Sequence, residues 1–178
     1  MKILRLEGTV VVGHSMGGAI AIELALNLRN DLAGLVLANS GAKLGVLPEI
    51  LTGLQTDPER TLREIILPKA LFRDSGLRAW ILSQSLLHGG KVCGRDYRIC
   101  SRFDERARLS EISLPVLILA GDHDGLTPVK WSEFLHKRLD RSSLLIIDKT
   151  AHMSMLEDPE TFNYALTQFI HRIKKETS

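Results

Sequence analysis

The feature that most constrains the fold is the segment Gly13-His14-Ser15-Met16-Gly17, which stands between a short apolar run and a helical pattern. The run before it is rich in valine, and residues 16 to 29 after it have helical apolar spacing. A strand that turns at once into a helix forces the serine into a strained backbone conformation. Side chains at the flanking glycine positions would collide with the turn. The segment therefore predicts a G-x-S-x-G turn that presents Ser15 at a helix N-terminus.

Three further apolar runs share the character of the first, with Val, Leu and Ile and without polar alternation. Strands of this kind are covered on both faces, as in a parallel sheet, and the helical patterns between them supply the crossovers. The last helix has Asp158 in the N-cap position and Pro159 at its first helical position. The pattern predicts an α/β fold with about four parallel strands flanked by helices, the strands at residues 9–13, 32–39, 115–122 and 143–148.

Residues 40 to 114 contain several helical patterns and no strand signal. A crossover between parallel strands needs only one helix, so the excess predicts an insertion over one end of the sheet. We therefore expect a core, residues 1–39 and 115–178, and a helical lid, residues 40–114. Apolar lid residues could line an acyl or alkyl pocket, although helical packing explains the same pattern.

Composition narrows the classes of partner. Lys and Arg number 23 against 21 Asp and Glu, and 44% of residues are hydrophobic, so we expect a globular protein that binds neither nucleic acid nor an anionic membrane. No apolar run approaches the roughly 20 residues of a membrane span, and the first is too short for a signal peptide. We expect a cytoplasmic protein with small-molecule substrates. If their segment is helical, Cys93 and Cys100 stand about 10 Å apart along it, which predicts free thiols.

Acidic residues and a histidine follow the third and fourth apolar runs. Asp122 and Asp124 lie in the turn after "LPVLILAGD", and His152 lies in a loop ahead of the last helix. The carboxyl ends of parallel strands meet at one edge of a sheet, so we expect these side chains near Ser15. The chain order Ser, Asp, His is the order of a nucleophile turn completed by later strands. The spacing around Asp122 does not fit a calcium loop, and we predict no metal site.

Each of these features also has a structural interpretation. A serine can cap a helix, acidic residues form turns, and a lone histidine is usually structural, but all three at strand ends favour catalysis. The spacing of the glycines around Ser15 does not match the phosphate-binding motifs G-x-x-x-x-G-K-[ST] and G-x-G-x-x-G. We interpret "HGG" at 88–90 as a helix-ending turn. Four arginines, if helical, form a basic stripe that is either a solvated face or a site for an anionic substrate group, namely Arg95, Arg98, Arg102 and Arg106.

The chain resembles the α/β-hydrolases, of the lid-bearing esterase, lactonase and haloperoxidase-like kind. The resemblance is carried by "VVVGHSMGGAIAIELA", "FDERARLSEISLPVLILAGDHDGLTP" and "AHMSMLEDPETF". It implies Ser15 as the nucleophile, His152 as general base and acid, and Asp124 as the residue that orients His152. It also implies the N–H of Met16 as an oxyanion donor, a turn role for Asp122, and no cofactor.

In that family, four strands and two helices precede the nucleophile turn, whereas here residues 3–8, "ILRLEG", resemble only the tail of the second helix. The resemblance thus predicts a truncated α/β-hydrolase. The family's second oxyanion donor comes from the earlier part, and losing one donor costs about 10²–10³ in rate. The strand at residues 9–13 would be an open edge, so we expect a homo-oligomer through it or dependence on a separately supplied N-terminal segment.

The leading hypothesis is a serine hydrolase that cleaves a carboxylic ester, thioester or lactone through an acyl-enzyme. Cofactor-free haloperoxidase chemistry or carbon–carbon bond hydrolysis would use the same three residues, since this fold hosts many reactions. The alternative from another class is a catalytically weak or inactive remnant that acts in assembly. The set of Ser15, Asp124 and His152 favours an enzyme, and the short segment before the turn favours the remnant.

Overall fold

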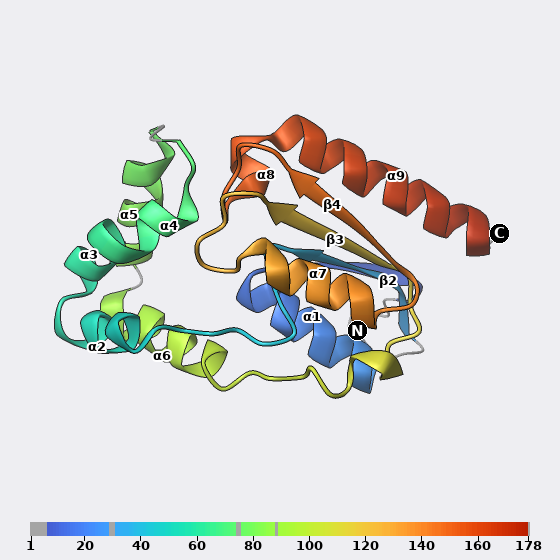
Figure 1. The fold of residues 1–178 in the computed structure, drawn as a ribbon, viewed down its shortest axis with the longest axis horizontal. Helices are drawn as coiled ribbons and strands as arrows, with labels where there is room; N and C mark the ends of the chain where they lie inside the picture. Colours follow the sequence, from blue (N-terminus) through green and yellow to red (C-terminus); the bar gives the residue numbers. More distant parts are fainter. Residues whose placement is uncertain (1–6, 29–30, 74–75, 88, 178) are drawn as a thin grey trace.

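A four-stranded parallel sheet forms the centre of the computed structural model, which describes residues 7–28, 31–73, 76–87 and 89–177 (Figure 1). The strands lie in chain order, so each crossover advances by one strand. Their bounds are Thr9–His14 (β1), Leu32–Ala38 (β2), Val116–Gly121 (β3) and Ser142–Ile147 (β4). The predicted α/β fold with four parallel strands is confirmed.

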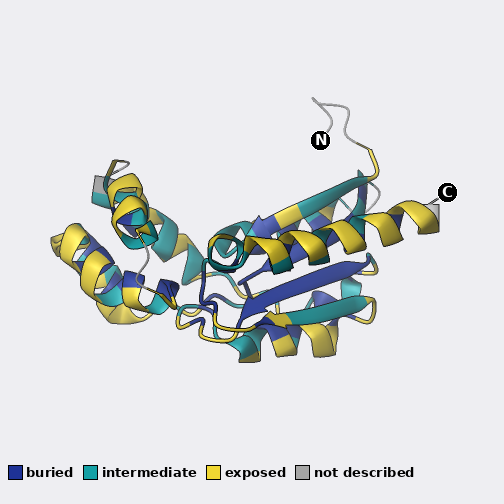
Figure 2. Ribbon diagram, turned by 90° about the horizontal axis from the view of Figure 1, so that it is seen from above, coloured by how far each residue is buried: buried dark blue, intermediate teal, exposed yellow. Residues whose placement is uncertain are grey.

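Helices cover both faces of the sheet (Figure 1). Helices α1 (Met16–Asn27) and α7 (Val129–Arg138) pack on one face, and α9 (Pro159–Thr177) packs on the other. Along β2, Leu35 and Leu37 enter the cluster under α1 and α7, whereas Val36 and Ala38 enter the cluster under α9. Burial on both faces explains why this strand is a continuous apolar run, and Figure 2 shows the central strands as the most buried part of the molecule.

The lid helices lie beyond the carboxyl ends of the strands and have an apolar cluster of their own (Figures 1 and 2). The chain then returns along the core through a short 3₁₀ turn at Leu109–Glu111, where Leu109 and Ile112 join the cluster under α1 and α7. The lid consists of α2 (Pro48–Thr56), α3 (Pro58–Thr61), a π-helical turn (Leu62–Ile66), α4 (Leu67–Ala70), α5 (Leu77–Leu87) and α6 (Gly89–Cys100).

Helix α5 ends at Leu87, directly before "HGG", and Gly89 and Gly90 are the first residues of α6. A Cβ at position 90 would lie 2.0 Å from Cγ of Pro58, so only glycine permits this close packing. The predicted arginine stripe is wrong. Helix α6 ends at Cys100, so Arg102 and Arg106 lie outside it and the four arginines form no continuous helical stripe. The interpretations placed on residues 3–6, 29 and 88 lie outside the described residues.

Two smaller predictions are confirmed. The Asp158 carboxylate accepts the backbone N–H of Thr161 at 3.0 Å, as expected of an N-cap residue at the start of α9. Cys93 and Cys100 are free thiols. Within the described ranges, none of the helices is long and apolar enough to cross a membrane.

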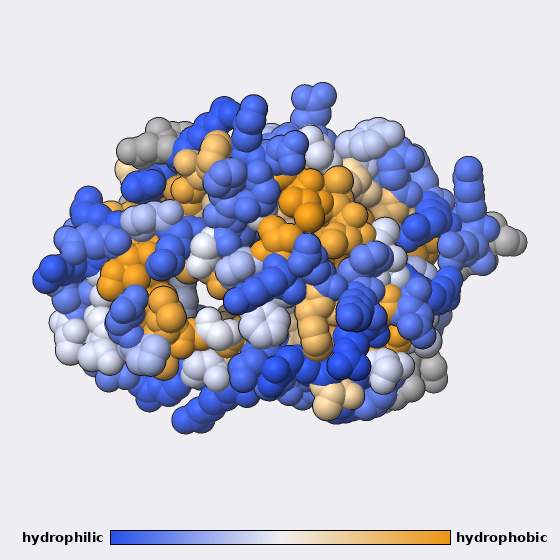
Figure 3. Space-filling view, viewed as in Figure 1, coloured by the Kyte–Doolittle hydropathy of each residue, from blue (hydrophilic) through white to orange (hydrophobic). Residues whose placement is uncertain are grey.

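The two edge strands differ in their surroundings. In the described part of the chain, β1 pairs only with β2, and Val12 on β1 is 49% exposed. At the other edge, Ile146 of β4 is 38% exposed. Figure 3 shows apolar side chains between the hydrophilic surfaces of α9 and α7. An unpaired strand with exposed apolar side chains is a site for association.

Helix α9 approaches β2 closely at Gly34, where a Cβ would lie 2.9 Å from Cδ1 of Ile173 and 3.2 Å from Cζ of Phe169. We expect Gly34→Val to lower the free energy of unfolding by about 1–3 kcal/mol, because the added methyl groups overpack this contact. Urea denaturation followed by circular dichroism measures the change. Gly45→Ala is the control, since a Cβ there meets nothing within 4 Å. Equal stability of the two variants would contradict the packing argument.

Candidate active site

Ser15 occupies the turn between β1 and α1 in the strained conformation that the sequence predicts. Its φ is 52°, in the left-handed region, which costs a residue with a side chain about 1–3 kcal/mol. Hydrogen bonds to the next strand hold it there: the N–H of Ser15 donates to the carbonyl of Ala38 at 3.0 Å, and its own carbonyl accepts Oγ of Ser40 at 2.8 Å. The end of β2 thus stabilises the turn.

Gly13 and Gly18 allow β1 and α1 to meet, whereas a Cβ at Gly17 would meet nothing within 4 Å, so the predicted collision at Gly17 is wrong. A Cβ at Gly13 would lie 2.2 Å from the carbonyl oxygen of Gly17, so no side chain fits at that position. Gly18, which the sequence argument did not single out, would place a Cβ 2.3 Å from Oγ of Ser40. At the start of α1, the N–H of Met16 has no acceptor among the described residues, as is usual for the first N–H groups of a helix. It is therefore available to an external anion.

Asp124 lies in the turn after β3, and its carboxylate is fully buried among hydrogen-bond donors. Oδ1 accepts the backbone N–H groups of Leu126 and Thr127, both at 2.8 Å. Oδ2 accepts Oγ1 of Thr127 at 2.7 Å, Nδ2 of Asn39 at 3.1 Å and Nδ1 of His152 at 2.9 Å. Burial by itself would raise the pKa of this carboxyl, but the hydrogen bonds from His152 and Thr127 hold its pKa below the ordinary value. Asp124 is therefore ionised at neutral pH.

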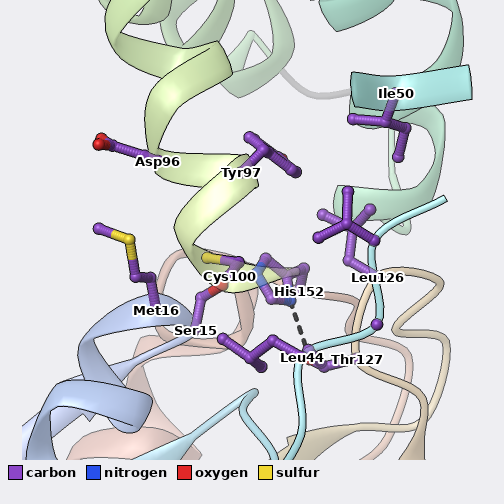
Figure 4. Close-up of a pocket in the computed structure, with 12 residues that line it drawn as sticks. Ser15, Met16, Leu44, Ile50, Asp96, Tyr97, Cys100, Leu126, Thr127 and His152 are labelled. Carbon is purple, nitrogen blue, oxygen red and sulfur yellow. Dashed lines mark hydrogen bonds between the residues drawn. The ribbon is translucent and has the colours of Figure 1, made fainter. Parts of the chain in front are cut away.

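His152 lies in the loop after β4, buried, with Nδ1 directed to Asp124. Its backbone carbonyl accepts Nε2 of His14 at 2.8 Å, and the two imidazole rings lie 4.8 Å apart. Ser15 and His152 line the same cavity (Figure 4). The hydrogen bonds of the described residues include none between Oγ of Ser15 and the imidazole of His152. The structure thus brings together the three residues that the sequence selects, with a direct contact between two of them.

Asn39 and Thr127 also belong to this cluster, and the sequence argument missed both. Asn39 has a positive φ of 47° at the end of β2, and its Nδ2 donates to Asp124 and to the carbonyl of Ala151 at 2.9 Å. Its Oδ1 accepts Oγ of Ser154 at 2.5 Å. Asn39 could have been identified from its position in the sequence. In "LVLANS" it is a polar residue at the carboxyl end of a buried strand, as Ser15 and Asp124 are.

Asp122 has a different role from Asp124. One of its carboxylate oxygens accepts the N–H of Thr150 at 3.1 Å and contacts Nδ1 of His123 at 2.7 Å. It thereby joins the turn after β3 to the loop that leads to His152. Asp122 is a turn residue in this geometry.

The cavity above Ser15 measures about 220 Å³ and lies between the sheet edge and the lid (Figure 4). Figure 3 shows the surface hollowed between the lid helices and the rest of the molecule. Burial raises the pKa of the Cys100 thiol to about 11 and also raises the pKa of Tyr97, so both groups are neutral at physiological pH. The cavity wall is mostly apolar, and the lid contributes Ile50, Asp96, Tyr97 and Cys100 to it.

A parallel sheet with a strained serine after one strand and a buried Asp–His pair after two later strands defines an α/β-hydrolase. In agreement, the sequence profile of the serine aminopeptidase S33 family matches residues 5–159, and the chain belongs to this family.

Similar proteins are esterases and lactonases. A pimeloyl-[acyl-carrier protein] methyl ester esterase of Serratia marcescens is 29% identical over 89% of this chain and 69% of its own length. The 3-oxoadipate enol-lactonase 2 of Acinetobacter baylyi is 28% identical over 95% of this chain and 66% of its own length. Among solved structures, a thermophilic esterase is 38% identical with a TM-score of 0.86, over 93% of this chain and 66% of that one. The chain thus spans about two thirds of the length of these proteins.

The partly buried imidazole of His14 makes stability depend on pH. Burial, followed by the neighbouring His152, lowers the pKa of His14 from 6.5 to about 4. Between these pH values the unfolded chain binds a proton that the folded chain does not. The free energy of unfolding should therefore fall as pH falls through this window, by up to about 3 kcal/mol from this group. Urea denaturation at several pH values should show a flatter dependence for His14→Gln than for wild type, and parallel curves would contradict this.

Proposed function

We propose that this chain is a serine hydrolase that acts on small carboxylic esters, including thioesters or lactones, with Ser15, His152 and Asp124 as its catalytic residues. The observation that carries the proposal is the 2.9 Å contact between Nδ1 of His152 and a buried, ionised Asp124, beside a cavity that His152 shares with the strained Ser15. The names of the similar esterase and lactonase support an ester or lactone substrate.

The proposed mechanism assigns one step to each group. Asp124 keeps the proton of the imidazole on Nδ1, which leaves Nε2 of His152 free to remove the proton of Ser15 Oγ. Oγ attacks the carbonyl carbon, and the N–H of Met16 stabilises the oxyanion. His152 then protonates the leaving oxygen or sulfur, and the bond to the leaving group breaks. His152 then deprotonates a water molecule, whose oxygen attacks the acyl carbon. The bond from this carbon to Oγ breaks, the acid leaves, and His152 returns the proton to Oγ.

The cavity wall favours an apolar acyl or alkyl group in the substrate. Ile50 and Leu126 are apolar, and Tyr97 and Cys100 are neutral. The charged lining residue Asp96 has its carboxylate 3.5 Å from Nε of Arg95. Apolar walls with few polar groups are typical of small-molecule sites. We therefore propose neutral esters as the substrate class.

Replacement of the nucleophile tests the proposal. We expect Ser15→Ala to lower kcat for p-nitrophenyl acetate and butyrate by at least about 10³, because the acyl-enzyme cannot form. A fluorophosphonate should label wild type at Ser15, as located by mass spectrometry. Ser83→Ala, an exposed lid serine, is the control and should keep wild-type activity. Equal activity of wild type and Ser15→Ala would contradict the proposal and favour a catalytically inactive chain.

We also propose that the chain self-associates through the unpaired edge of β1. Light scattering during size-exclusion chromatography should give a mass above the 19.8 kDa of one chain. Val12→Lys should shift the mass to the monomer, since a charge on an edge strand opposes pairing. Ile146→Lys, at the opposite edge of the sheet, should leave the mass unchanged. A stable, well-folded wild-type monomer would contradict this proposal.

A further inference from the structure

Glu157 joins two segments that are far apart in the sequence. It ends the short helix α8 (Ser154–Glu157), which follows the His152 loop. Oε1 accepts the backbone N–H groups of Phe72 at 2.7 Å and Arg73 at 3.2 Å, directly after α4 of the lid. Oε2 accepts the N–H of Ala151 at 2.7 Å, one residue before His152. One carboxylate therefore holds the end of a lid helix and the backbone beside the candidate catalytic histidine.

Backbone hydrogen bonds reinforce this connection. The N–H of Met153, one residue after His152, donates to the carbonyl of Ala70 at 3.2 Å. The N–H of Gly125, one residue after Asp124, donates to the carbonyl of Lys69 at 3.0 Å. Residues on both sides of His152 are thus bound, directly or through Glu157, to the lid segment at residues 69–73. This segment also contacts the turn after β3, where the rings of Phe72 and His123 lie 4.3 Å apart.

The contacts of Glu157 are hydrogen bonds from backbone N–H groups to a carboxylate. Hydrogen bonds from N–H groups to an ionised carboxylate are about twice as strong as neutral ones. Within the described part of the chain, Glu157 makes no ion pair with a lysine or arginine, so its charge is directed to these three N–H groups. The proposed general base depends on placement to within about 0.5 Å, and supporting residues supply such placement.

We infer that Glu157 is a positioning residue that couples the seating of the lid to the alignment of His152, an inference that rests on the proposed function. Displacement of the end of α4 moves the Glu157 carboxylate, and with it the N–H of Ala151 and the adjacent His152. When the lid segment keeps its hydrogen bonds to Glu157, the imidazole of His152 is held in place. When these hydrogen bonds break, the imidazole is free to move.

The test compares Glu157→Ala, Glu157→Gln and the control Glu160→Ala, which removes the same charge from an exposed residue of α9. The measured quantity is kcat per active site, with sites counted by fluorophosphonate titration. We expect Glu157→Ala to lower it by about ten- to a hundredfold, since small misplacements of catalytic groups have effects of this size. Glutamine offers one acceptor oxygen instead of two, so Glu157→Gln should be intermediate. Glu160→Ala should match wild type.

Amide hydrogen exchange, resolved by NMR, supplies a second readout. In Glu157→Ala the exchange of Phe72 and Ala151 should accelerate together, while amides in the middle of α9 keep their wild-type protection. A residue that merely stabilises the fold would lower the number of titrated sites and the protection of all elements, and leave kcat per site unchanged. That result would overturn the inference.

The same experiments separate this inference from the proposed function. If wild type does not react with the fluorophosphonate, the proposed function fails, and the coupling is decided by exchange alone. Joint acceleration at Phe72 and Ala151 then supports the connection between lid and loop, and acceleration confined to Phe72 overturns it. If wild type reacts and Glu157→Ala turns over at the wild-type rate per site, the positioning role is wrong while the proposed function stands.

Discussion

The rest of the site depends on the burial of one negative charge, the carboxylate of Asp124. An ionised carboxylate removed from water is costly unless hydrogen-bond donors surround it, and here five donors do so. They come from Asn39 at the end of β2, from Leu126 and Thr127 in its own turn, and from His152 after β4. Satisfying this charge therefore fixes three strand ends relative to one another, and the imidazole is oriented as part of the same arrangement.

The strain at Ser15 is held by the same sheet edge. A left-handed serine persists only if its surroundings leave no alternative, and the contacts with Ala38 and Ser40 provide that constraint. The residue between them, Asn39, is itself left-handed and donates to Asp124. The end of β2 thus supports the proposed nucleophile on one side and the Asp–His pair on the other, which explains why residues without a catalytic role are buried and fully hydrogen-bonded there.

The sequence predicts the parts of this arrangement that are local. The turn at Gly13–Gly17 follows from backbone sterics within five residues, and the four strands follow from apolar runs that need burial on both faces. The roles of Asn39 and Glu157 depend on partners more than 80 residues away, as in the contacts with Asp124 and Phe72, and no local pattern specifies them. The start of α6 at Gly89 was not predicted, and the close approach of Pro58 to Gly90 is a tertiary contact that the local sequence does not specify.

In the proposed chemistry, the Asp–His pair that transfers protons has more supporting contacts than the site that would stabilise the oxyanion. The Asp124–His152 pair is enclosed by donors, by the lid contacts of Glu157 and by the carbonyl contact with His14. On the oxyanion side, the described residues place one free N–H, that of Met16, next to Ser15, beside the unpaired edge of β1. Because one oxyanion donor is typically worth about 10²–10³ in rate, a second donor beside that of Met16 would raise turnover by a similar factor. A segment that pairs with β1 would lie next to this N–H, so whatever covers that edge is also placed to complete the site.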